Sequence, residues 1–357
     1  MRETYGVSNE KTALAITIAN REKALLQDLD YENGYSLYVG IPFCPSICLY
    51  CSFGSHPLER WTKRVDEYLD TLCKELTFIR EQMGARKLTT VYIGGGTPTT
   101  LEPEQLRRLL SHIQETFDFT WVKEYTVEAG RPDSITKEKL QVMKEFPVTR
   151  ISVNPQTMNQ KTLDVIGRKH TVEDTVNIFH MARELGFDNI NMDLIIGLPG
   201  EGKEEVAHTL QEVENLHPDS LTIHSLALKR ATRLNLFKDK YEEMSFENSQ
   251  EIMEMTQQCA GNMGMGPYYL YRQKNIAGNF ENVGYAEVDK AGIYNILIME
   301  EKQTILAAGA GASTKFVFEH GTRIERVENV KDVNNYILRI DEMLERKRVG
   351  IQKYLNG

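Results

Sequence analysis

The chain has 357 residues, of which 41% are hydrophobic and 26% are charged, so it holds enough apolar material for a sizeable core. This composition excludes a disordered tail protein, a collagen-like repeat and a small disulfide scaffold. The balance of 42 Lys and Arg against 51 Asp and Glu gives a net charge of −9, which argues against binding of bulk nucleic acid.

Residues 1–34 are predicted to form a polar, partly helical lead-in, in which the stretch 13–26 packs on the wall of the domain that follows. The N-terminus carries mixed charge and lacks the apolar core of a signal peptide. No later run approaches the roughly 18 uncharged residues that a membrane helix needs. We therefore expect a cytoplasmic protein without a membrane span.

From residue 36 to about residue 226, short β-branched runs alternate with longer helical patterns. This alternation predicts parallel βαβ units, and six such units would form an open or partial barrel. Helix start signals, such as Pro103 and Thr136, support the pattern. The expected strands are 36–41, 89–93, 124–128, 150–154, 189–196 and 220–226, and the expected helices are 65–82, 104–116, 137–144, 172–185 and 204–216.

The regular alternation of strand and helix patterns ends after the sixth expected strand. A helix is predicted over 248–263, and a charged helix over 330–348. Between them lie aromatic or β-rich segments, at 268–272, 294–297, 304–307 and 322–325. The sequence thus predicts an α/β fold, a partial (β/α)6 TIM-like barrel over 35–235 followed by an α+β domain over 236–357 that covers the substrate.

Three of the five cysteines lie within eight residues, directly after the first expected strand. Cys44, Cys48 and Cys51 have C-x3-C-x2-C spacing, at the mouth where a barrel places catalytic groups. Thiolates suit zinc or iron–sulfur clusters, and a zinc site would require a fourth ligand, for which His56 is available. A [4Fe–4S] cluster is the better fit. Ordinary clusters of this kind are held by four cysteines, so three cysteines would leave one iron without a protein ligand. Cys73 and Cys259 are expected to pack in the interior or at the surface.

This cysteine loop resembles the signature of the radical S-adenosylmethionine (SAM) enzymes, with Tyr50 as the aromatic residue before the last cysteine. In that family three cysteines hold one [4Fe–4S] cluster, and the amine and carboxylate of SAM chelate its fourth iron. Cleavage of the C–S bond of SAM then gives a 5′-deoxyadenosyl radical that abstracts hydrogen. The run 94–98 (GGGTP) follows in family order, where glycines let the backbone approach the methionyl group closely.

The resemblance narrows to the oxygen-independent coproporphyrinogen III oxidase branch, and within it to the HemZ-type coproporphyrinogen dehydrogenases. It rests on the runs 38–44, 94–99, 193–199, 268–275 and 281–285 and covers the chain from about residue 35 onward. The lead-in is short for this branch, so we expect an N-terminal extension to be absent. The implied reaction is oxidative decarboxylation of two propionates of coproporphyrinogen III to vinyl groups, which gives protoporphyrinogen IX in anaerobic heme biosynthesis.

The resemblance also implies which residues meet SAM. All but Arg168 lie at or near the carboxyl ends of expected strands, where a barrel exposes its active site. Glu128, Arg168 and Asp193 have an alternative role as structural polar residues on the rim. The expected SAM contacts are Tyr38, Tyr50, Gly95, Gly96, Thr97, Glu128, Gln156, Arg168, Asp193 and Ala227.

A substrate with four propionates requires cations to clamp it. Arg230 and Arg233 follow the sixth expected strand, and Arg272 lies in an aromatic run. The planar fork of arginine meets a carboxylate with two hydrogen bonds, so we expect these residues to bind propionates. The alternative for each one is a solvated surface charge.

Three departures from the branch bear on how many SAM molecules bind. Gly40 stands where relatives have His, and Ser52 and Phe53 stand where the oxidases continue with Gly-Cys. The run 309–313 keeps the glycine pattern of the family, but Lys315 falls where an apolar residue touches a second SAM. These changes leave the first SAM site untouched, and they leave open whether one or two SAM molecules bind.

Two alternative functions belong to the same branch or superfamily: a heme-binding chaperone and a radical SAM heme methyltransferase. The chaperones carry a His-Asn-x-x-Tyr-Trp segment after the barrel, whereas this chain has ENVGYA at 281–286. That difference favours the enzyme. The expected partners are a tetrapyrrole and an electron donor such as flavodoxin or ferredoxin.

Overall fold

The structure is a computed structural model that describes residues 4, 6–51, 56–227, 229, 232–236, 246–274, 276, 278 and 280–356. Its centre is an 11-stranded sheet in the order β13-β12-β11-β1-β4-β5-β6-β7-β8-β10-β9. Six of these strands run parallel in chain order and confirm the six expected strands. They are β1 (Gly34–Ile41), β4 (Lys87–Gly95), β5 (Glu124–Gly130), β6 (Arg150–Val153), β7 (Ile190–Ile196) and β8 (Ser220–Ser225).

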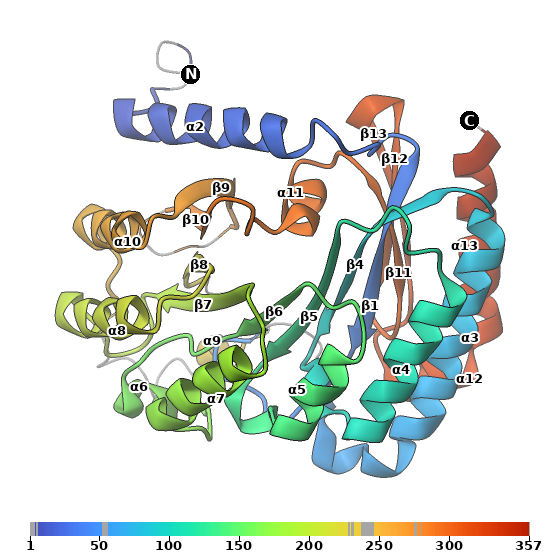
Figure 1. Ribbon diagram of the computed structural model, residues 1–357, viewed down its shortest axis with the longest axis horizontal. Coiled ribbons are helices and arrows are strands. Elements are labelled where there is room, and N and C mark those ends of the chain that lie inside the picture. The colour runs from blue at the N-terminus through green and yellow to red at the C-terminus, as the bar shows by residue number, and fades with distance from the viewer. Residues whose placement is uncertain are drawn as a thin grey trace.

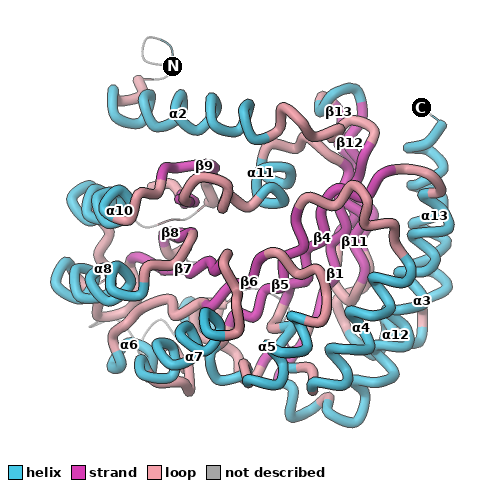
Figure 2. The backbone as a smooth tube through the Cα atoms, in the orientation of Figure 1, coloured by secondary structure: helices cyan, strands magenta, loops and turns pink. Residues whose placement is uncertain are grey.

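The parallel strands form an open arc with the connecting helices on its outer side (Figure 1). Figure 2 shows the strands gathered at the centre and these helices around them. The arrangement is the predicted partial barrel, because each helix returns the chain to start the next parallel strand. The helices of the arc are α3 (Val65–Met83), α4 (Pro103–Thr116), α5 (Lys137–Lys144), α6 (Gln160–Val165), α7 (Val172–Glu184) and α8 (Lys203–Leu216).

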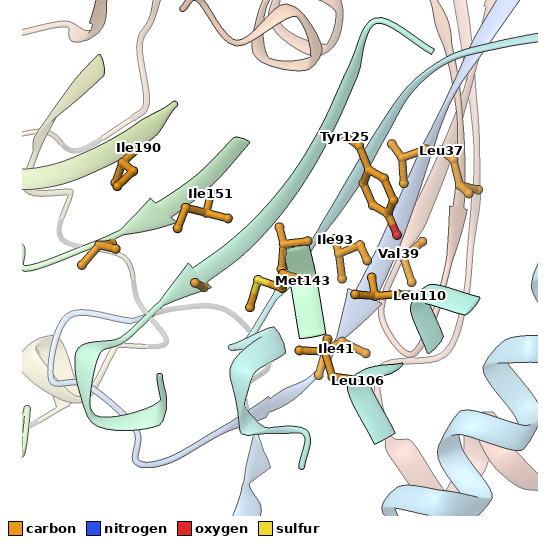
Figure 3. Close-up of a cluster of buried hydrophobic side chains, with 14 of the residues drawn as sticks. Leu37, Val39, Ile41, Ile93, Leu106, Leu110, Tyr125, Met143, Ile151 and Ile190 are labelled. Carbon is orange, nitrogen blue, oxygen red and sulfur yellow. The ribbon is translucent and has the colours of Figure 1, made fainter. Parts of the chain in front are cut away.

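Successive side chains of each strand point to opposite faces of the sheet, so one face carries an apolar layer and the other forms a polar barrel interior. Leu37, Val39 and Ile41 of β1 lie against the helix layer, where Leu106 and Leu110 of α4 meet them (Figure 3). The residues between them on β1 therefore face the other side of the sheet. Interior-facing positions of this kind carry Ser36, Tyr38, Thr90, Tyr92, Asn191 and Asp193. Polar side chains thus line the barrel interior up to its mouth.

The C-terminal residues extend this sheet at both of its edges. β10 (Asn282–Ala286) pairs antiparallel with β8, and β9 (Gly266–Tyr271) pairs with β10. At the other edge β11 (Thr304–Ala308) runs parallel to β1 and is followed by the antiparallel strands β12 (Ser313–Phe318) and β13 (Arg323–Glu328). The strands that follow residue 235 therefore belong to the same sheet as the barrel strands. The domain boundary at residue 235 stays a prediction.

Three expectations about local structure are corrected. The segment 294–297 lies in helix α11 (Ile293–Met299), because the buried Glu124 carboxylate accepts hydrogen bonds from the first backbone N–H groups of that helix. The terminal helix is divided into α12 (Val333–Leu338) and α13 (Ile340–Asn356), with non-helical backbone at Arg339. The lead-in forms helix α2 (Asn9–Leu25), which packs on β9 rather than on the barrel wall.

The remaining described elements are short or lie beside the site. β2 (Phe43–Cys44) and β3 (His56–Pro57) pair with each other, and α9 (Arg233–Leu236) follows β8. Helix α10 (Gln250–Asn262) confirms the helix expected over 248–263. Within the described ranges, none of the helices has the length and apolar character needed to cross a membrane.

Candidate functional site

A cavity of about 310 Å³ opens at the carboxyl ends of the six parallel strands. Parallel strands of a barrel all end at the same face, so the loops that follow them converge there. The three clustered cysteines line this cavity, and every expected SAM contact except Tyr38 lines it as well. The lining residues from the expected set are Cys44, Cys48, Tyr50, Cys51, Gly95, Gly96, Thr97, Glu128, Gln156, Arg168, Asp193 and Ala227.

The cysteine loop forms one wall, and neighbouring side chains hydrogen-bond to its sulfur atoms. The Thr97 hydroxyl lies 3.6 Å from Cys44 Sγ, and Arg131 Nη1 lies 3.6 Å from Cys48 Sγ. Burial raises the pKa of the Cys44 thiol to about 11, and the charges of the two neighbouring thiols add to the rise. A metal would reverse this shift, because a coordinating thiol loses its proton.

The glycine run lets the end of β4 pack closely against the same loop. The backbone N–H groups of Gly96 and Thr97 donate to Ile41 and Phe43 carbonyls at 2.7 and 2.8 Å. A Cβ atom on Gly96 would lie 2.5 Å from the Phe43 carbonyl oxygen and 3.0 Å from Cys44 Sγ. Only glycine fits at this position, and its packing partner is the cysteine loop itself.

Two metal groups could use the clustered cysteines: a zinc ion with His56 as fourth ligand, or a [4Fe–4S] cluster. Among the described residues, no group of three or more His, Cys, Asp or Glu side chains is already gathered around one metal position. His56 does not line the cavity; its ring packs edge-on against Trp61 and its Nε2 lies 3.4 Å from the Lys331 carbonyl oxygen. His56 therefore does not lie in the cavity that the cysteines line, where the zinc alternative would need its fourth ligand. Three thiols on one cavity wall fit the chemistry of a cluster held by three cysteines.

Two carboxylates form the floor of the cavity, and their pKa values are shifted in opposite directions. Burial, followed by the charge of Asp193, raises the pKa of Glu128 to about 7, although Tyr92 donates to its Oε1 at 3.1 Å. Burial also opposes ionisation of Asp193, but hydrogen bonding and charge from His224, with Asn191, lower its pKa overall. Near neutral pH the floor thus holds one ionised acid and one that is poised to titrate.

Arg168 joins the cysteine loop to the end of β6. Its guanidinium donates to the Asn154 carbonyl oxygen at 2.6 Å and to the Tyr50 hydroxyl at 3.2 Å. Tyr38 lies deeper in the barrel, with its ring 6.2 Å from that of Tyr92 and its hydroxyl beside Gly95. Arg168 therefore lines the cavity and holds the cysteine loop, whereas Tyr38 lies behind the lining.

Two of the three expected substrate arginines are described, and neither of these lines the cavity. Arg233 is exposed on α9 and Arg272 is exposed after β9. Arg230 lies outside the described residues, as do Ser52 and Phe53. Their assignment to propionates stays a prediction.

Several lining residues were missed by the sequence analysis. Arg131 directly follows β5, and it donates to the Ser46 carbonyl oxygen at 2.9 Å and pairs with Asp133 at 2.6 Å. Its position after a parallel strand is the signal that could have identified it. Tyr271 and Asn282 come from β9 and β10, and nothing local in the sequence places those strands beside β8.

Comparisons with known proteins agree with this geometry. The radical SAM superfamily matches residues 38–213. The oxygen-independent coproporphyrinogen-III oxidase-like protein HemZ of Bacillus subtilis (strain 168) is 43% identical over 351 residues, which cover 97% of this chain and 70% of HemZ. The heme chaperone HemW of the same organism is 38% identical over 198 residues, so the match spans 55% of this chain and about half (52%) of HemW.

A solved structure shares the fold over most of the chain. Coproporphyrinogen III oxidase (HemN) from Escherichia coli, described as a radical SAM enzyme, matches with a TM-score of 0.70 and 25% identity, covering 90% of this chain and 73% of HemN. The chain belongs to the radical SAM superfamily, in the branch of HemN- and HemZ-like proteins. Membership of this superfamily implies a [4Fe–4S] cluster and SAM.

Proposed function

We propose that the protein is an oxygen-independent coproporphyrinogen III dehydrogenase. It would convert two propionates of coproporphyrinogen III to vinyl groups by radical SAM chemistry and so yield protoporphyrinogen IX. The observation that carries the proposal is the single cavity at the strand ends, which gathers the three cysteines with Glu128 and Asp193. The similarity to HemZ and HemN supports the choice of a tetrapyrrole substrate.

In this account Cys44, Cys48 and Cys51 hold one cluster, and Arg131 and Thr97 hydrogen-bond to its sulfur ligands. When bound, the cluster and SAM supply a carbon radical that removes a hydrogen atom from the substrate. Glu128 in its ionised form pairs with the SAM amine, and Gln156 and Asp193 line the same space. These residues orient SAM, since they lie on rigid strand ends.

The propionate then loses carbon dioxide and one electron, which leaves a vinyl group. The cluster needs an electron donor such as flavodoxin or ferredoxin, and the electron released from the substrate needs an acceptor outside the chain. We propose one SAM molecule per chain, since Lys315 does not line the cavity. Its ammonium donates instead to the Ile298 carbonyl oxygen at 2.7 Å and lies 3.6 Å from Glu301.

The volume of the cavity limits how the substrate binds. At about 310 Å³ it lies at the low end of the range for small-molecule sites. A tetrapyrrole ring system is too large to enter beside SAM. We therefore propose that one propionate side chain enters the cavity while the rings stay at its mouth.

The test is an anaerobic turnover assay with purified protein reconstituted with iron and sulfide. Incubation with SAM, a reductant and coproporphyrinogen III should release carbon dioxide and methionine and give vinyl products by mass spectrometry. The Cys48→Ala variant serves as the inactive control. Absence of carbon dioxide and vinyl products with a loaded cluster and cleavable SAM would contradict the proposal, and a methylated tetrapyrrole would point to a methyltransferase.

A heme chaperone is the second candidate, favoured by the similarity to HemW. The region where those chaperones carry their histidine is used here for other contacts. Glu281 pairs with Lys11 at 2.9 Å, and Asn282 Oδ1 accepts a hydrogen bond from the Ser225 backbone N–H at 2.7 Å. Stable binding of heme without turnover in the same assay would support the chaperone.

A further inference from the structure

The ends of β8, β9 and β10 build a wall of the cavity that carries none of the cysteines. His224 is on β8, Tyr271 ends β9 and Asn282 begins β10, and all three line the cavity. The antiparallel pairing of β10 with both β8 and β9 brings them together. None of these residues was among the expected SAM, metal or substrate contacts.

His224 lies between a carboxylate and a phenol. Its Nε2 is 3.8 Å from Asp193 Oδ2, and its Nδ1 is 3.0 Å from the Tyr271 hydroxyl oxygen. A protonated imidazole donates from both nitrogens, so Nδ1 would donate to the phenol oxygen. The hydroxyl group of Tyr271 can then donate its proton to a third group, and both side chains line the cavity.

This wall is rigid. The buried Asn282 side chain accepts from the Ser225 backbone N–H at 2.7 Å and donates to the Tyr271 carbonyl oxygen at 3.3 Å, which ties the ends of β8 and β9 together. The Tyr271 ring stacks on Tyr269 with a centroid distance of 6.3 Å and an interplanar angle of 4°. Donors held in this way bind an anion without a large loss of side-chain entropy.

Two arginines that line this cavity have partners on the cluster side. Arg131 pairs with Asp133 and bonds to the cysteine loop, and Arg168 bonds to the Asn154 carbonyl oxygen and Tyr50. They hold the loop, whereas His224 and Tyr271 present their donors on a different wall. Charge-assisted hydrogen bonds from such donors are the strong ones for a carboxylate.

We propose that the Tyr271 hydroxyl, held by its hydrogen bond with His224, binds the carboxylate of the substrate propionate that enters the cavity. This inference rests on the proposed function and assigns the acid-binding subsite to β8 and β9 rather than to the exposed arginines. Asn282 is a positioning residue for the pair. A carboxylate anchor in the same cavity as the cysteine loop would hold the propionate within reach of SAM.

The test compares a porphyrin acid with its ester. Reconstituted protein with SAM bound is titrated anaerobically with coproporphyrin III and with its tetramethyl ester in the same detergent, and binding is read from the absorbance spectrum. The His224→Gln and Tyr271→Phe variants should each weaken binding of the acid about tenfold and leave binding of the ester unchanged, since a hydrogen bond to a charged group is lost. His217→Gln and Tyr285→Phe are matched controls, because neither residue lines the cavity.

The outcomes separate this inference from the function on which it rests. One outcome is that the wild-type protein decarboxylates coproporphyrinogen III while both variants bind the acid with wild-type affinity. That result would overturn the proposed subsite and leave the proposed function standing. Equal loss of acid and ester binding would show a structural role and also overturn the subsite. If the wild-type protein binds neither porphyrin and releases no carbon dioxide, the proposed function and the subsite both fall.

Discussion

Glu128 and Asp193 show how neighbouring carboxylates acquire different protonation states at the scale of single residues. Both are half-buried and line the cavity, but Asp193 faces the imidazole of His224 whereas Glu128 has the hydroxyl of Tyr92. A low pKa for Asp193 and a pKa of about 7 for Glu128 follow from that difference in partners. Glu128 is therefore the group whose charge changes near neutral pH.

This assignment predicts a pH dependence of SAM affinity. If ionised Glu128 pairs with the SAM amine, affinity should rise about tenfold from about pH 5.5 to about pH 7, because the ionised fraction rises over that interval. An amine that chelates the iron is neutral, and its remaining N–H groups would donate to the ionised carboxylate. Loss of the ammonium proton, which titrates near 7.7–8.0 in free α-amino groups, adds a rise in affinity with pH that every variant shares. Isothermal titration of the cluster-loaded protein measures the effect. The Glu128→Gln variant should bind SAM more weakly and with a less steep profile, and an equally steep profile in that variant would rule out Glu128 as a source of the pH dependence.

Cysteine replacements test the metal ligands one residue at a time. Cys44→Ala, Cys48→Ala or Cys51→Ala should abolish the brown colour and nearly all bound iron after anaerobic reconstitution, since each removes one of three ligands. Cys73→Ala and Cys259→Ala are the controls. Cys259 is buried in α10 with its sulfur 3.6 Å from the Leu210 carbonyl oxygen, far in sequence from the loop. Full iron content in any of the three loop variants would contradict the assignment.

At the scale of elements, the site depends on how tightly the end of β4 packs on the cysteine loop. Gly96 has no room for a side chain, whereas a Cβ atom on Gly261 in helix α10 would meet no heavy atom within 4 Å outside the backbone of its own helix. The two glycines therefore form a matched pair for substitution. Glycine is required at the first by packing and is only a flexible residue in a helix at the second.

Gly96→Ala should lower the free energy of unfolding by about 1–3 kcal/mol and reduce cluster loading, because the added methyl group pushes on the Phe43 carbonyl and Cys44. Gly261→Ala should stabilise the chain by up to about 1 kcal/mol. Urea unfolding and iron analysis measure both effects. Wild-type stability and iron content in Gly96→Ala would show that the loop and the strand end are not closely packed.

The terminal helix α13 is held to the barrel by a buried ion pair between Lys347 and Glu75 of α3. Glu75 also accepts hydrogen bonds from the Tyr336 hydroxyl at 2.7 Å and the Gly309 backbone N–H at 2.8 Å. A network of this kind ties α3, α12 and α13 to the turn after β11. Removal of Lys347 leaves the buried Glu75 carboxylate without its counter-charge.

Lys347→Met should therefore destabilise the fold by about 3–5 kcal/mol, measured by urea unfolding. Arg348→Met is the matched control on the next residue, since its pair with Glu345 is exposed and screened by solvent, so its loss should change stability little. Similar stability of the two variants would mean that the buried pair does not anchor the helix.

At the scale of the whole molecule, the sequence predicts the barrel well and its edges poorly. Runs such as β7 are buried on both faces and read as strands, and the helices between them have clear start signals. The β-branched and aromatic run in α11 was expected to be β-rich, but Glu124 from β5 caps it as a helix. Tertiary contacts of this kind override local preference.

The same contrast holds for the site. Residues that follow parallel strands, such as Glu128 and Asp193, can be found from position alone, because all those strands end at one face. His224 lies within the sixth expected strand and lines the cavity. Its partner Tyr271 could not be predicted, since the contact depends on the long-range pairing of β9 and β10 with β8.

The most direct measurement of the central claim follows a hydrogen atom from substrate to cofactor. Reconstituted protein is incubated anaerobically with SAM, a reductant and coproporphyrinogen III that carries deuterium on the methylene carbons of its propionates, and the mass of the 5′-deoxyadenosine product is determined. The account predicts 5′-deoxyadenosine that gains deuterium together with deuterated vinyl products. Formation of 5′-deoxyadenosine without deuterium, while the tetrapyrrole is recovered unchanged, would contradict it.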